Sequence, residues 1–121
     1  MIDSEKIISD FDNYCILYDI AEKALDHKVA NKFAKKIINS YLQLRELGKV
    51  AALEKLLYSE NENVRLWAAT HLLEVKEDIA KKVLKELAEK SDLLGFSAET
   101  TLNEWNNGNL KLEYKNYKVK W

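Results

Sequence analysis

Few residues of this sequence have the types and spacing that catalysis or metal binding requires. The chain contains two histidines, His27 and His71, and one cysteine, Cys15. His71 and Glu74 are three residues apart, which places them on one side of a helix, but no second pair completes a metal site. A catalytic cysteine needs a base partner, and the sequence indicates none for Cys15. We therefore expect a structural or solvent-facing His71, a Cys15 packed in the core, and no metal or cofactor.

The sequence also lacks the motifs of common enzyme classes. It contains no Gly-x-Ser-x-Gly elbow, phosphate-binding loop or dinucleotide fingerprint, so we expect it not to be an enzyme. Nineteen basic and twenty acidic residues give a net charge of -1, which shows no overall bias toward nucleic acid or anionic membranes. The single cysteine, the acidic start and the absence of a long apolar run predict a cytoplasmic protein without a membrane span.

The elements that position these residues are predicted to be helices. The chain has no proline, and its three glycines fall where helices should start or stop. Apolar residues recur at spacings of three and four along most of the chain, which is the helical pattern. This pattern predicts helices at about residues 4–25, 28–47, 49–58, 62–75, 77–90 and 95–106.

Short polar turns between these helices predict an all-α domain of about three helical hairpins over residues 1–108. Residues 109–121 form a separate C-terminal arm in this interpretation. The arm alternates apolar and basic residues in two short runs. That pattern fits a small β-hairpin, an extended arm, or a segment that becomes ordered only on contact with a partner.

An internal repeat of thirty residues relates the last four helices. Shifting the chain by this length places Ala68 on Ala98 and Thr70 on Thr100, and it matches two helices and their turn without a gap. A unit that cannot bury its own apolar face must stack on a neighbour, so the repeat predicts an α-solenoid.

The stretch "VRLWAATHLL", residues 64–73, resembles the inner helix of a HEAT-like repeat, whose signature is Val-Arg, paired small residues and a leucine. The residues that match the repeat pattern are Asn61, Val64, Arg65, Ala68 and Leu72. The resemblance implies a structural role for Arg65, which in such repeats bonds to a neighbouring repeat. Gly95 stands at the equivalent place in the next unit, so that unit is degenerate or a cap.

The whole chain is similar to a small bacterial HEAT-like family of domains of unknown function, some of which are immunity proteins that neutralise toxins. This resemblance implies a non-enzymatic protein-binding module, most concretely an immunity protein that occludes a toxin domain. A general interaction adaptor fits the same residues. Alkylpurine DNA glycosylases also contain HEAT-like repeats, but they need a basic groove and a longer chain. The basic excess of residues 27–53 lies mainly on one helix, at Lys28, Lys32, Lys35 and Lys36, which is more typical of a solvated face, so nucleic-acid binding is the less favoured alternative.

Several large apolar residues are predicted to face away from the helical core. At 100° per residue, a core stripe centred on Ala68 turns Leu66 and Leu73 toward the opposite side, and Phe96 is the repeat equivalent of Leu66. Such a surface on the inner helices of a solenoid is a typical place for partner binding. The predicted partner-binding strip contains Leu66, Trp67, Thr70, Leu73, Glu74, Phe96, Thr100 and Glu104. The alternative is that the N-terminal hairpin or the arm covers this strip.

Overall fold

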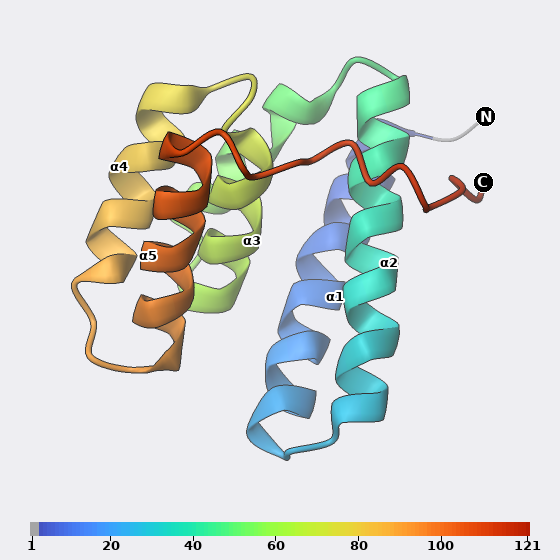
Figure 1. Cartoon of the computed structure of the whole chain (residues 1–121). Helices are drawn as coiled ribbons and strands as arrows, with labels where there is room; N and C mark the ends of the chain where they lie inside the picture. The colour runs from blue at the N-terminus through green and yellow to red at the C-terminus, as the bar shows by residue number, and fades with distance from the viewer. Residues whose placement is uncertain (1–2) are drawn as a thin grey trace.

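The computed structural model describes residues 3–121, and helices are the regular elements of this part of the chain (Figure 1). They are α1 (Ser4–Lys23), α2 (His27–Glu46), the 3-10 helix η1 (Val50–Tyr58), α3 (Glu62–Leu72), α4 (Glu77–Ala88) and α5 (Leu93–Asn106). The predicted all-α class is confirmed. Residues 3–121 contain no strand, so the β-hairpin considered for the C-terminal arm is not formed.

Side chains at the helix starts explain where several helices begin. Asp3 caps α1 by accepting a hydrogen bond from the Glu5 amide at 3.0 Å. Asn61 caps α3 in the same way, with distances of 2.8 Å to the Asn63 nitrogen and 3.1 Å to the Val64 nitrogen. These bonds satisfy amides that have no partner inside the helix. Local side-chain bonds therefore mark where α1 and α3 begin.

The third helix differs from the regular α-helix that its sequence suggested. The segment Val50–Tyr58 is a 3-10 helix, in which residues three apart lie above one another. Val50, Leu53 and Leu56 have this spacing and are all buried. Spacing by three fits either type of helix over so short a stretch, which explains the difference.

The helices form two groups on either side of α3. The α1–α2 hairpin lies on one side, the α4–α5 hairpin lies on the other, and α3 contacts α1, α4 and α5 (Figure 1). The 3-10 helix η1 packs mainly on α3. Because α1 and α5 both contact α3, the middle helix separates them and leaves space between the two hairpins.

One continuous apolar core runs through both groups. Phe11 and Tyr41 from the first hairpin are fully buried, and so are Leu53 and Leu72 from the middle elements. Cys15 is also fully buried, as predicted for a small core residue. Since these side chains belong to one cluster, the two helical groups are expected to unfold together.

The C-terminal arm, residues 109–121, follows α5 and crosses to α2 (Figure 1). Asn39 pairs with the Lys120 backbone through two hydrogen bonds of 3.0 and 2.8 Å. Arg45 donates a hydrogen bond to the Leu112 carbonyl at 3.2 Å. The Leu112 side chain is only 1% exposed. The arm is therefore part of the folded unit and contributes to its core.

Arg65 makes a structural contact, but within its own helical pair and not as the bond to a neighbouring repeat that the resemblance implied. Its Nη1 donates a hydrogen bond to the Ser59 carbonyl at 2.6 Å. Ser59 caps the end of η1, so the guanidinium ties this helix to the first turns of α3. The repeat equivalent of Arg65, Gly95, lies in the first turn of α5 and makes no such tie.

The close packing of α3 gives a direct test. Ala68 and Ala98, which the thirty-residue shift places at equivalent positions, are both fully buried. We expect Ala68→Leu to lower the free energy of unfolding by about 1–3 kcal/mol, because the added carbons must displace packed neighbours. Urea denaturation measures this change, with Ala52→Leu at an exposed position as the control. An unchanged midpoint for Ala68→Leu would contradict the packing described here.

Candidate functional site

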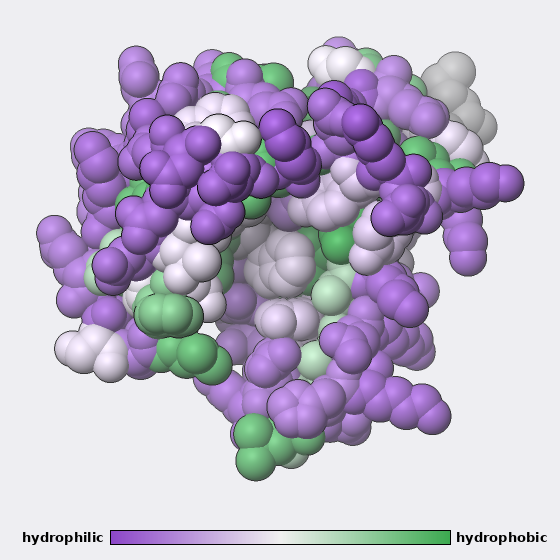
Figure 2. Space-filling model, in the orientation of Figure 1, coloured by the Kyte–Doolittle hydropathy of each residue, from purple (hydrophilic) through white to green (hydrophobic). Residues whose placement is uncertain are grey.

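A cleft of about 740 Å³ opens between α1 and α5, and α3 forms its floor. Figure 2 shows the hollow at the centre of this face. We refer to it as the α1–α5 cleft. One wall is the C-terminal half of α1, the other is the N-terminal half of α5, and Tyr114 of the arm also lines it. A volume of this size is within the usual range for binding sites of small molecules and side chains.

The floor of the cleft is mainly aromatic. Leu66, Trp67, Thr70 and His71 line it from α3, at the spacing that brings residues to one side of a helix. The Trp67 ring meets the Tyr18 ring edge to face, with centroids 5.3 Å apart. It also stacks on the His71 ring, with centroids 5.9 Å apart and planes only 6° from parallel. Trp67 is half-buried and is thus held in a defined orientation by its neighbours.

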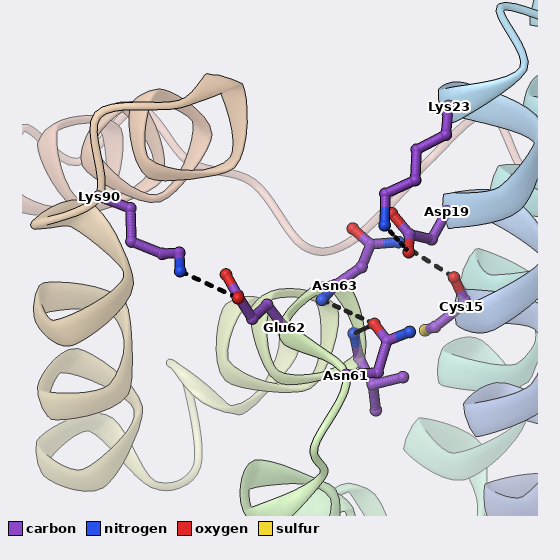
Figure 3. Close-up of polar contacts among 8 residues, drawn as sticks. Cys15, Asp19, Lys23, Asn61, Glu62, Asn63 and Lys90 are labelled. Atoms are coloured by element: carbon purple, nitrogen blue, oxygen red, sulfur yellow. Dashed lines mark hydrogen bonds and ion pairs between the residues drawn. The ribbon is translucent and has the colours of Figure 1, made fainter.

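The first turn of α3 is fastened to α1 at the edge of the cleft. Asn63 is buried, and its side-chain amide donates to the Cys15 carbonyl at 3.0 Å (Figure 3). Nearby, Lys23 pairs with Asp19 at 3.1 Å, and Lys90 pairs with Glu62 at 2.9 Å (Figure 3). The Lys90–Glu62 pair joins the end of α4 to the start of α3. The buried Asn63–Cys15 hydrogen bond therefore holds the α1 wall against the floor, in addition to packing.

His71 is fully buried at the upper end of the floor, and both ring nitrogens are hydrogen-bonded. Nδ1 lies 2.8 Å from the Trp67 carbonyl oxygen, and Nε2 lies 2.7 Å from the Tyr114 hydroxyl. A carbonyl can only accept a hydrogen bond, so Nδ1 carries the proton and Nε2 accepts from Tyr114. The neutral ring thus connects α3 to the C-terminal arm.

Burial favours the neutral forms of His71, of two tyrosines that line the cleft and of the nearby Cys15. Burial lowers the pKa of His71 to about 4, which keeps the ring neutral at physiological pH. Burial also raises the pKa of Tyr114 and that of the Cys15 thiol. For Tyr18, burial together with the Glu22 carboxylate raises the pKa to about 12. None of these shifts would activate a nucleophile or a general base near pH 7.

Neither a protein-family model, nor a curated protein, nor a solved structure matches the chain. In residues 3–121 no three histidine, cysteine or carboxylate side chains are grouped so that they could hold a metal ion. Over the same residues, every helix is too short or too polar to cross a membrane.

The neutral state of His71 makes stability depend on pH. The folded protein binds a proton at this ring only near pH 4, whereas the unfolded chain binds it near the ordinary value of 6.5. Stability is therefore unaffected by this group above pH 6.5 and falls as the pH decreases from 6.5 toward 4. At pH 5 the expected loss is about 2 kcal/mol. Urea denaturation of the wild type and of His71→Gln, each at pH 5 and above pH 6.5, isolates the effect. An equal loss of unfolding free energy at pH 5 in the two proteins would contradict it.

The structure brings only part of the predicted strip into the cleft. Leu66, Trp67 and Thr70 line the floor, whereas the α5 wall presents Leu93, Leu94, Ser97 and Thr101. Phe96, Thr100 and Glu104 do not line the cleft, nor does Glu74, which lies beyond the end of α3. Phe96 is 65% exposed. The thirty-residue shift matches Leu66 with Phe96, but the two side chains have different surroundings. Leu66 lies on the floor of the cleft because α3 forms that floor, whereas Phe96 lies on a side of α5 that does not face the cleft.

Leu73 corrects the prediction of an outward-facing side chain, because it is fully buried. It shares one side of α3 with Leu66, two turns further along the helix. The C-terminal arm reaches this end of α3, where Tyr114 is bonded to His71, and Leu73 joins the same core cluster as Leu112. The side of α3 that is open at Leu66 is therefore closed at Leu73.

Sequence reasoning missed the contribution of α1 to the site. The apolar spacing of residues 4–25 does not show that Tyr18 and the acidic residues around it face α3. The residues of the cleft that were missed include Tyr18, Asp19, Glu22, Glu60, Glu62 and Asn63. The strongly acidic first 26 residues were the available signal, but they do not show which helix α1 packs against.

Proposed function

We propose that the protein is a non-enzymatic protein-binding module whose partner enters the α1–α5 cleft. The observation that carries this proposal is Trp67, a half-buried ring held rigidly on the floor of a cleft of about 740 Å³. Aromatic anchors of this kind dominate binding energy at protein interfaces. A preorganised ring also loses little conformational freedom when a partner binds.

The buried titratable groups support binding over catalysis. His71 uses both ring nitrogens in hydrogen bonds to Trp67 and Tyr114. Cys15 is fully buried in the core, and its carbonyl, not its thiol, faces Asn63. These groups hold the helices and the arm together, which leaves the cleft with shape, aromatic surface and charge as its means of recognition.

The most concrete form of the proposal is an immunity protein that occludes a toxin domain. The resemblance of "VRLWAATHLL" to an inner HEAT-like helix supports it, with η1–α3 and α4–α5 as the stacked units of a short solenoid. A general interaction adaptor is the second form and uses the same cleft. The two differ in gene context, since a toxin gene immediately upstream favours immunity.

A pair of matched variants on α5 tests whether the cleft is the binding surface. Ser97 lines the cleft, whereas Thr100, one turn further along α5, does not. Ser97→Arg should block the cleft, and Thr100→Arg adds the same side chain outside it. Affinity capture from the native organism identifies the partner, and direct titration then measures binding of each variant.

We expect Ser97→Arg to weaken binding of that partner by about tenfold or more, and Thr100→Arg by less than about threefold. Equal binding by both variants would place the partner on another surface. For the immunity form, co-expression should protect cells from the identified partner, and Ser97→Arg should remove the protection.

A further inference from the structure

The rim of the α1–α5 cleft carries an excess of negative charge. Five carboxylates line it, and Lys23 is the one lining lysine among the described residues. The carboxylates come from three separate parts of the chain: Asp19 and Glu22 of α1, Glu60 and Glu62 before and at the start of α3, and Asp92 before α5. Because α1 ends where α3 and α5 begin, all five gather at the same end of the cleft (Figure 1).

Helix capping explains only some of these carboxylates. Asp92 caps α5 by accepting a hydrogen bond from the Gly95 amide at 2.9 Å. Glu62 lies in the first turn of α3, where a negative charge interacts favourably with the helix dipole. Glu22 has the opposite position, near the C-terminal end of α1, where a negative charge is unfavourable. Glu60 is exposed and precedes the cap of α3. Helix capping and the helix dipole therefore do not account for Glu22 and Glu60.

The ion pairs at the rim are open to exchange. In the Lys23–Asp19 pair the lysine side chain is 78% exposed, and in the Lys90–Glu62 pair it is 40% exposed. Exposed pairs of this kind contribute little to stability. An incoming cation can therefore replace or join the lysines at small cost.

The floor and the α5 wall supply two further types of contact. The Trp67 and Tyr18 rings meet edge to face beside the carboxylates, and aromatic faces attract guanidinium and ammonium groups. Leu93 lines the α5 wall and is 74% exposed. In Figure 2 hydrophobic atoms also gather at the lower ends of both helical hairpins. The site thus combines negative charge, aromatic rings and apolar surface.

We propose that the cleft takes a basic, amphipathic segment of a partner protein, with arginine or lysine side chains between the rim carboxylates and Trp67 and with apolar side chains against α5. This inference rests on the proposed binding function and adds the chemistry of the partner. Charge complementarity at such a rim accelerates association and rejects acidic partners. The negative rim also repels nucleic acid and anionic lipid, so a protein segment is the occupant that fits.

Selection from a phage-displayed library of random peptides tests the inference. The library is selected on the immobilised protein and depleted on Ser97→Arg, so that the retained peptides depend on the cleft. Their affinities are then measured on a cleft variant, Glu22→Lys with Glu60→Lys. The matched control is Glu86→Lys with Glu89→Lys, which reverses two exposed charges at the C-terminal end of α4, away from the cleft. Glu60→Lys alone is the second cleft variant, because Glu60 lies in an exposed turn.

We expect the retained peptides to be basic and amphipathic. The cleft variant Glu22→Lys with Glu60→Lys should bind them about tenfold or more weakly than the wild type. The α4 control should change their affinity by less than about threefold, and added salt should weaken binding. Equal losses in both charge variants would overturn the inference, because overall charge alone would then explain binding. Neutral or acidic peptides that depend on the cleft would overturn it as well and leave the binding function standing. If no peptide depends on the cleft, the proposed binding site itself fails.

Discussion

Shortening the chain after Asn109 is expected to lower the free energy of unfolding by about 4 kcal/mol or more. The deletion removes the buried Leu112 side chain and the Tyr114 hydroxyl that bonds to His71. It also uncovers Tyr41, whose ring lies 5.9 Å from that of Tyr114. Small domains are stable by only about 5–15 kcal/mol, so this loss would leave a marginal fold. Thermal and urea denaturation followed by circular dichroism measure it.

A chain that ends after Tyr117 is the matched control for this deletion. It keeps Leu112 and Tyr114 and loses the exposed hydrogen bonds of Lys120 to Asn39 and Gln43, together with the partly buried Val119 side chain. We expect a cost of about 1 kcal/mol for the control. If both shortened chains were equally stable, the middle of the arm would not belong to the core.

Gly95→Ala is expected to lower the free energy of unfolding by about 3 kcal/mol or more, the upper part of the range for overpacking. A Cβ at this position would overlap the Lys90 carbonyl oxygen and lie 2.8 Å from the Lys90 carbonyl carbon. These are backbone atoms at the end of α4, so no side chain can move away to make room. Alanine normally stabilises a helix by about 1 kcal/mol relative to glycine, and a loss of stability would therefore come from the close contact.

Gly48→Ala separates this contact from the conformational effect of glycine. Gly48 follows α2 with a φ of 68°, and a Cβ there would have no heavy atom within 4 Å. Only the left-handed backbone is strained by the substitution, at a cost of about 1–2 kcal/mol. Urea midpoints of the two variants compare the effects directly. A smaller loss for Gly95→Ala than for Gly48→Ala would contradict the tight approach of α4 and α5.

The helices could be predicted from the sequence because their causes are local. Asn61 begins α3 with its own side chain, and apolar residues spaced by three and four identify the buried sides. The type of helix at Val50–Tyr58 could not be predicted in this way, since its stripe fits both helix types. The arm was equally ambiguous. Its course depends on Asn39, Arg45 and His71, which are distant in sequence and act only after the helices have packed.

The cleft shows a similar division between local and tertiary causes. Leu66 was predicted from periodicity to face away from the core, with Trp67 in the same strip, and the structure places both on the floor. Their surroundings depend on the packing of α1 against α3, which the Asn63–Cys15 hydrogen bond helps to fix. Residues of two helices far apart in sequence meet there, and no single-helix pattern contains that information. The acidic rim follows from the same packing.

The course of the arm also determines the order in which the protein can assemble during synthesis. Tyr114 is 43 residues from its partner His71, and Lys120 is 81 residues from Asn39. Both hairpins, in contrast, are closed by residues that are near in sequence, so they can form early and rapidly. The ribosome has made both hairpins before residues 110–120 emerge, so docking of the arm is expected to be the last folding step. Until then Tyr41 and His71 lack their cover, and a nascent chain at this stage is a substrate for chaperones and proteases.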